Sequence, residues 1–289
     1  MGVSAGLFLV WLLTPALLSV RGWPRDQAEA SKAIQAVERW SPITPNGRGL
    51  LDRLTPNLGS LLNFDDGMPI IDVGEVPSEI VVSADVLENA ALSIVRIRAI
   101  ACSQRQDGTG FIISPGMALT NAHVVAGSQN VEVALPGSAL ELVTVVAFDP
   151  ERDLALLRVN SNIEALRLEA PLAGQLAGVI GHPAGGPLRT APIRLVERVV
   201  AHGRDLHDSV DTTRKVWFAA AKLQTGDSGA PVINNNGAAV GVIFAVAPPD
   251  ASDHERAVYV LDRSEIAAFM AEVAAFGDRT VVNTGKCLR

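Results

Sequence analysis

The chain has 289 residues, of which 48% are apolar and 4% aromatic, and its net charge is −7. This length fits one domain of about 200 residues with an N-terminal extension, and the apolar share is enough for a sizeable aliphatic core. The acidic balance, without a basic tract, argues against nucleic-acid binding. No cysteine or histidine spacing predicts a metal site, so we expect neither metal nor cofactor.

The N-terminal residues 1–22 are predicted to form a transmembrane segment. Val3 to Val20 are almost wholly apolar, which is about the length of a helix that crosses a bilayer. A cleaved signal peptide is the alternative, weakened by the lack of basic residues ahead of the run and of a small-x-small cleavage site near its end. Arg21 and Arg25 follow the run, and this charge pattern alone would place the rest of the chain inside.

Residues 23–80 are predicted to hold an amphipathic helix and a linker. In residues 26–40, apolar side chains recur at roughly helical spacing. Proline and glycine then punctuate a stretch without a strong period. We expect this linker either to pack on the following domain or to stay mobile.

Short β-rich runs alternate with turn residues from about Val81, which is typical of an all-β barrel or sandwich. The first series comprises Leu92–Ile97, Gly110–Ile113, Ala118–Thr120, Val131–Leu135, Val143–Phe148 and Leu154–Val159. The second comprises Val179–Ile180, Ile193–Val200, Val216–Ala219, Pro231–Ile233, Ala239–Val246 and Val258–Val260. Asn234–Gly237 predicts a hairpin turn, and Ser264 is predicted to cap a terminal helix that ends near Phe276.

Only two cysteines are present, Cys102 and Cys287. In a protein exported past a membrane they could form one disulfide. Two buried free thiols are the alternative.

Three local patterns carry candidate chemistry. His123 follows a small residue at the end of a predicted strand, in Thr120–Val125. Asp153 precedes the apolar run that begins at Leu154. Ser228 lies in a tight turn with glycines near it, within Thr225–Pro231.

These residue types fit nucleophilic catalysis. A serine hydroxyl is a poor nucleophile unless a base such as histidine accepts its proton. A buried carboxylate fixes the tautomer of the imidazole and stabilises its protonated form. The N–H groups of Gly226 and Ser228 would bind the developing oxyanion, because a glycine adopts the backbone conformation that this requires.

Each pattern also has a structural interpretation. A lone histidine after a strand is more often structural, an aspartate before a strand is usually a turn residue, and a glycine-flanked serine is often part of a plain loop. The order His123, Asp153, Ser228 in one all-β chain favours a catalytic triad over three coincidences.

From about Asp85 onward the chain resembles the trypsin-like serine proteases, especially the bacterial HtrA-like branch. The resemblance rests on Ala122-His123, on Asp153–Leu157 and on Gly226–Pro231. It implies two antiparallel six-stranded β-barrels of the chymotrypsin type, in residues 81–175 and 176–289, with a short C-terminal helix. It also implies a serine endopeptidase that acts on proteins or peptides through an acyl-enzyme.

More narrowly, the chain resembles the acid-resistance periplasmic proteases of mycobacteria and related actinobacteria. This resemblance implies a disulfide between Cys102 and Cys287, an extracytoplasmic protease domain and a role in acid or oxidative stress. Members of the group carry several membrane helices ahead of the protease, whereas this sequence shows one apolar run. The cysteine pair and the resemblance lead us to expect export, against the charge pattern at Arg21 and Arg25.

Two positions near Ser228 carry further expectations. The chain lacks the Ile-Val-Gly-Gly start whose freed N-terminus pairs, in trypsin-like zymogens, with the aspartate that matches Asp227. Asp227 is therefore expected to find another partner or to act as a solvent-facing turn residue. Lys222 lies where such enzymes place the base of the primary specificity pocket, and it either favours acidic side chains or extends into solvent.

An alternative function stays open on the sequence alone. The protease fold could serve as a catalytically silent binding or scaffold module of the cell envelope. The sequence predicts nothing about the oligomeric state.

Overall fold

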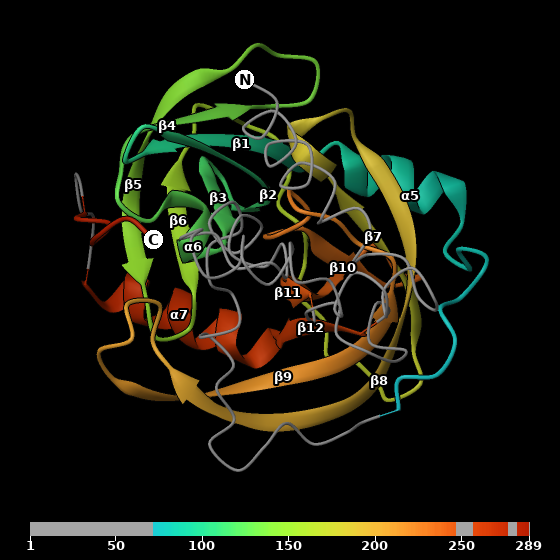
Figure 1. Ribbon diagram of the computed structural model, residues 1–289. Coiled ribbons are helices and arrows are strands. Elements are labelled where there is room, and N and C mark those ends of the chain that lie inside the picture. Colours follow the sequence, from blue (N-terminus) through green and yellow to red (C-terminus); the bar gives the residue numbers. More distant parts are fainter. Residues whose placement is uncertain (1–71, 247–256, 277–281, 289) are drawn as a thin grey trace, which may run out of the picture. The chain divides into compact units, whose positions relative to one another are not determined.

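Figure 1 shows the computed structural model, which describes residues 72–246, 257–276 and 282–288. In this part of the chain, twelve strands form two six-stranded antiparallel sheets, and each sheet closes into a barrel. The predicted transmembrane segment 1–22 and the predicted amphipathic helix at 26–40 lie outside the described residues. Within the described ranges, no helix has the length and apolar character that crossing a membrane requires.

The first barrel closes because β1 pairs with β2 on one side and with β4 on the other. Val95, Ile97 and Ala99 of β1 alternate into its interior, where they pack with apolar residues of the other five strands. The strand order is β1-β2-β3-β6-β5-β4. The bounds are β1 Ile94–Ala101, β2 Gln104–Ser114, β3 Met117–Thr120, β4 Ser128–Ala134, β5 Glu141–Asp149 and β6 Leu154–Arg158.

The second barrel closes through β7, which pairs with both β8 and β10. Its interior is filled by small and β-branched side chains, among them Val179, Ile193 and Val232. The strand order is β10-β11-β12-β9-β8-β7. The bounds are β7 Leu176–Gly181, β8 Arg189–Arg204, β9 Asp211–Ala221, β10 Pro231–Ile233, β11 Ala239–Val246 and β12 Ala257–Asp262, followed by the helix α7 Arg263–Phe276.

Every apolar run expected from the sequence overlaps a strand, although Leu92, Leu135 and Val159 at the ends of three runs lie outside the strands. Several strands extend beyond their run. The run Ile193–Val200, for example, belongs to β8, which also includes polar residues at both ends. The hairpin at Asn234–Gly237 is confirmed, with the Gly237 N–H donating to Asn234 O at 3.0 Å between β10 and β11. Two short helices were not expected, α5 at Ala84–Ala91 and α6 at Ala122–Val125.

The expected cap of the C-terminal helix is wrong by two residues. Asp262, which precedes α7, accepts the Ser264 N–H through its Oδ1 at 2.8 Å. The buried Ser264 hydroxyl has no hydrogen-bond partner among the described residues. Asp262 is the cap because β12 runs directly into α7. The residue at this junction accepts a hydrogen bond from an N–H in the first turn of the helix, which has no partner within the helix.

The chain ahead of the first barrel packs on the second one. Arg194 of β8 donates to the carbonyls of Val73 at 2.9 Å and Glu75 at 2.7 Å. Leu87 of α5 lies against Gly178 of β7, and Figure 1 shows this helix beside that strand. Of the two alternatives for the linker, packing therefore holds for its described end.

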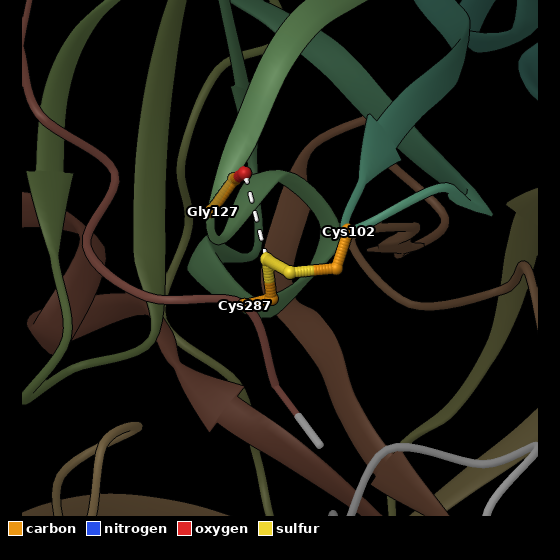
Figure 2. The surroundings of a disulfide bond; sticks show 3 residues. All are labelled: Cys102, Gly127 and Cys287. Carbon is orange, nitrogen blue, oxygen red and sulfur yellow. Dashed lines mark hydrogen bonds between the residues drawn. A yellow bond between two sulfur atoms is a disulfide. The ribbon is translucent and has the colours of Figure 1, made fainter.

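Cys102 and Cys287 form a disulfide, so the alternative of two free thiols is wrong (Figure 2). The bond joins the β1–β2 turn to the C-terminal tail, and the two Cα atoms are 6.2 Å apart. The tail also pairs with the loop after α6, where the Gly127 N–H donates to Thr284 O at 3.0 Å. Gly127 has φ +65°, and a Cβ there would collide with the backbone of Cys287.

Candidate active site

His123 lies in α6, the short helix that follows β3 directly. Val124 and Val125 of this helix are buried in the interior of the first barrel and fix its position. The His123 side chain is consequently held outside the barrel interior, yet it is only 5% exposed to solvent.

Asp153 lies between β5 and β6, and its carboxylate binds His123 twice. Its Oδ2 lies 2.6 Å from His123 Nδ1, and its Oδ1 accepts the His123 N–H at 2.7 Å. Asn121 Nδ2 donates to the Asp153 carbonyl at 3.0 Å. Because an ionised carboxylate only accepts hydrogen bonds, the ring proton belongs on Nδ1, and Nε2 is left as the basic nitrogen.

The loop that carries Asp153 depends on the second barrel for its shape. Asp149 Oδ1 accepts the N–H groups of Glu151 and Arg152, each at 2.9 Å, which folds the loop tightly. Arg214 of β9 donates to the Glu151 carbonyl. Asp153 itself has φ +57°, a left-handed conformation that aspartate tolerates better than most residues.

Arg214 also brings a buried positive charge near the site. Burial lowers the pKa of its guanidinium, and the surrounding carboxylates oppose this, Asp153 most strongly. The side chain lies over the ring of Phe244, with its guanidinium carbon 5.5 Å from the ring centroid.

Ser228 lies on the turn that precedes β10 and is half-buried. Its carbonyl accepts the Thr109 N–H at 2.9 Å, which ties the turn to β2 of the first barrel. Among the described residues its hydroxyl forms no hydrogen bond, to His123 or to any other group. The structure thus joins His123 to Asp153 directly, and it places Ser228 on a loop anchored to the same barrel.

The residues before Ser228 form a tight turn. The Asp227 N–H donates to Gln224 O at 3.0 Å, and Gly226 has φ +97°. A positive φ at the third position with this bond is the pattern of a type II turn, which favours glycine there. The N–H groups of Gly226 and Ser228 have no acceptor within the part of the chain that the structure describes.

Of the two alternatives for Asp227, an internal partner holds and a solvent-facing turn residue does not. Its side chain is 2% exposed, and its Oδ2 accepts from Arg189 Nη2 at 3.2 Å and from the Gln224 N–H at 2.9 Å. Burial raises the pKa of Asp227 above its ordinary value, although these two donors and the nearby His182 oppose the rise.

Lys222 is exposed, while its carbonyl accepts a hydrogen bond from Arg189 at 3.3 Å. Sequence reasoning missed Arg189, Arg214 and Thr109, a buried threonine that contacts the Ser228 turn. For Thr109 a signal was present, because a polar residue between two glycines in an apolar strand indicates close backbone packing. Among the described residues, no group of histidine, cysteine and carboxylate side chains could hold a metal ion.

Two closed antiparallel barrels whose loops meet around these residues define the chymotrypsin class of fold. A family model described as the trypsin-like peptidase domain matches residues 108–242. "Serine protease Rv3671c" of Mycobacterium tuberculosis is 33% identical over 306 aligned residues, which cover 99% of this chain and 74% of that protein. The chain therefore belongs to the trypsin-like serine proteases, and it is a serine endopeptidase.

Solved structures agree with this assignment. The crystal structure of the active form of Rv3671c matches with a TM-score of 0.69 and 35% identity, over 77% of this chain and 97% of that one. Its inactive form matches with a TM-score of 0.60 over 70% of this chain and 99% of that one, at 35% identity. The "Probable periplasmic serine endoprotease DegP-like" of Chlamydia pneumoniae is 32% identical over 146 residues, 48% of this chain and 28% of that protein.

Proposed function

We propose that this protease hydrolyses peptide bonds with Ser228 as the nucleophile, His123 as the general base and Asp153 as the residue that orients the base. The observation that carries the proposal is the buried double hydrogen bond between His123 and Asp153. This bond directs the basic Nε2 away from the carboxylate, as a base that serves a serine hydroxyl requires.

The reaction follows from these positions. The Ser228 oxygen attacks the substrate carbonyl while His123 accepts its proton, and the negative charge that develops on the carbonyl oxygen is bound by the N–H groups of Gly226 and Ser228. His123 then protonates the leaving amine, and an acyl-enzyme remains on Ser228. Water, deprotonated by His123, hydrolyses this ester and restores the serine.

Lys222 stays a candidate for the primary specificity pocket. Its exposed side chain fits the alternative in which it extends into solvent better than the alternative of a buried pocket base.

The location in the cell is the second part of the proposal. The protease domain lies on the extracytoplasmic side, attached to the membrane through residues 1–22, and it acts in acid or oxidative stress or in maintenance of the envelope. Support comes from the apolar run Val3–Val20, from the disulfide, which is typical of oxidising compartments, and from the word "periplasmic" in the name of the DegP-like relative.

A fluorophosphonate probe, which reacts only with an activated serine, tests the catalytic assignment. We expect it to label the parent chain and to miss Ser228→Ala, and we expect His123→Ala to lose at least about 10³-fold in the rate of labelling, because the serine then lacks its base. Cleavage of casein by the same samples should follow the labelling.

The alternative is a catalytically silent binding module. One observation favours it: the Ser228 hydroxyl forms no hydrogen bond within the described residues. That function predicts no labelling of a correctly folded parent chain. Labelling at a serine other than Ser228 would instead contradict the assigned nucleophile.

A further inference from the structure

Thr109 of β2 is a polar side chain at the contact between the first barrel and the Ser228 turn, and it is 0% exposed. Its hydroxyl donates to Gly226 O at 2.8 Å and accepts the His182 N–H at 2.8 Å. Its own N–H donates to Ser228 O at 2.9 Å, and its carbonyl accepts the Thr120 hydroxyl at 2.7 Å. One residue thus holds the backbone on both sides of Asp227.

The peptide before Gly226 is held from the other side. Thr225 O accepts the N–H of Ala184, a residue at φ +52° in the turn after β7, at 2.6 Å. In a trans peptide the N–H points opposite to the C=O, so the Gly226 N–H points away from Ala184. With Gly226 O bound to the Thr109 hydroxyl, both peptides that flank the glycine have fixed orientations.

The backbone of the Ser228 turn packs closely against Thr109 on one side and Ala184 on the other. A Cβ at Gly229 would collide with the Thr109 carbonyl, and one at Gly226 would collide with the Ala184 nitrogen. The hydrogen bonds therefore belong to a tight backbone contact rather than to a flexible surface loop.

The Gly226 N–H belongs to the Thr225–Gly226 peptide, so rotation of that peptide would change the chemistry of the site. A flip that turns a carbonyl oxygen toward the reacting group would replace a donor with an acceptor and repel the oxyanion. The Thr109 hydroxyl binds the carbonyl of the next peptide, Gly226–Asp227, which lies between the two N–H donors. Rotation of this peptide would leave a buried carbonyl and a buried hydroxyl without partners, which is costly, so the hydroxyl fixes the backbone that joins the Gly226 and Ser228 N–H groups.

We infer that Thr109 is a positioning residue of this protease, whose hydroxyl holds the Gly226 carbonyl so that the Gly226 and Ser228 N–H groups stay directed at one oxygen. This inference rests on the proposed catalytic function of Ser228. Thr109 touches neither the substrate nor the reacting atoms, and it acts through the turn.

The test compares Thr109→Val, which keeps the shape and removes the hydroxyl, with Thr109→Ser, which keeps the hydroxyl. With a fluorogenic peptide that the parent cleaves, we expect kcat of Thr109→Val to fall about 10-fold to 100-fold, less than the loss of an oxyanion donor itself. KM should change less than about twofold, because the lost interaction acts in the transition state. Thr109→Ser should regain most of kcat.

A second measurement separates positioning from stability. A peptide aldehyde forms a hemiacetal with the active serine, and its oxygen occupies the oxyanion site, so its affinity should fall in parallel with kcat in Thr109→Val. Trp217→Phe removes a buried hydrogen bond to Asp262 in the same barrel and serves as the control for destabilisation alone. At a temperature well below its unfolding transition, this variant should keep the kcat of the parent.

Thr109→Ala also lacks the hydroxyl, and it gives the same readout if the valine variant does not fold. Activity of Thr109→Val or Thr109→Ala within about twofold of an active parent would overturn the inference while leaving the proposed function intact. A folded parent that neither reacts with the probe nor cleaves peptides would overturn both. Failure of Thr109→Ser to restore kcat would also contradict the role of the hydroxyl.

Discussion

Asp227 is a buried carboxyl group in the Ser228 turn, and its protonation bears on the stability of the fold. It precedes Ser228, the proposed nucleophile, and its internal partner is the partly exposed Arg189. The pairing means that this chain holds its turn with a side-chain cation, where trypsin-like zymogens use a freed N-terminus. We accordingly expect the turn to form without any cut in residues 23–80.

Asp227→Asn should change how stability depends on pH. Because burial raises the pKa of Asp227 in the folded state, the folded chain binds the proton more tightly than the unfolded chain. The stabilisation from the protonated carboxyl is complete below the unfolded pKa, about 4, and it is lost as pH rises through the higher folded pKa. Urea unfolding of parent and variant across this range should show the parent losing stability relative to Asp227→Asn as pH rises.

A difference between the two chains that stays constant from pH 3 to 8 would contradict this. Arg189→Lys is a suitable control, because it keeps a cation that can reach the carboxylate and should leave the sign of the pH dependence unchanged.

At the residue scale, the sequence predicted the groups that sit in local motifs and missed their distant partners. His123 and Asp153, which the structure joins by hydrogen bonds, could be named as candidates because each adjoins an apolar strand in a pattern that chemistry restricts. Thr109 contacts Gly226 from 117 positions away, and Arg189 contacts Asp227 from 38 positions away. No local pattern records such pairs, since closure of the barrels brings them together.

At the scale of elements, the junction between β12 and α7 depends on Asp262. Its Oδ1 caps the helix through the Ser264 N–H at 2.8 Å, and its Oδ2 accepts from Trp217 Nε1 at 2.7 Å. Burial acts to raise the pKa of Asp262, but hydrogen bonds from Ser264 and Trp217, together with Arg198, outweigh it and lower the pKa. One carboxylate therefore ties a strand, a helix and a core tryptophan together.

Asp262→Ala should lower the free energy of unfolding by about 2 kcal/mol at neutral pH, as the sum of a lost cap and a lost buried hydrogen bond. Ser264→Ala should lower it by clearly less than Asp262→Ala does, because the backbone N–H at position 264 still donates to Asp262 Oδ1. Urea unfolding measures both. A larger loss of stability in Ser264→Ala than in Asp262→Ala would instead identify Ser264 as the capping residue, as the sequence predicted.

Strands were predictable because their apolar runs are bounded by turn residues, as at Pro231–Ile233 and its hairpin. The short helices were not, since α5 and α6 are too brief for a helical period to register. The helix cap was misplaced because Asp262 and Ser264 are both good capping residues, and only the end of β12 decides between them.

At the scale of the whole described domain, the proposed catalytic residues depend on both barrels. The first barrel supplies His123 and Asp153, and the second supplies Ser228 and the guanidinium of Arg214 that holds the Asp153 loop. The two-barrel architecture came from the resemblance of three motifs to a known family, because alternation alone fits a barrel or a sandwich equally.

Loss of the disulfide should destabilise the domain strongly. The bond spans 185 positions, and closing a loop of that size in the unfolded chain contributes about 5 kcal/mol in the chain-entropy picture, less any native strain. Cys102→Ser should therefore unfold at clearly lower temperature than the oxidised parent, and a reductant should lower the parent to the level of the variant. A melting temperature that does not respond to reductant would contradict this expectation.

The disulfide should also support catalysis, because the tail that it anchors pairs with the loop after the helix that carries His123. We expect slower probe labelling in Cys102→Ser at a temperature where both chains are folded. Equal labelling rates in the two chains would contradict this and would show that the disulfide stabilises the fold without affecting catalysis.

The same bond also affects what happens when a protease cuts this chain. Everything between Cys102 and Cys287 forms a covalent ring, which includes nearly all of both barrels. A single nick in any exposed loop of that ring opens the circle without releasing a fragment, so both halves stay tethered until a thiol reductant arrives. A clipped preparation should run as one band on a non-reducing gel and as two after reduction.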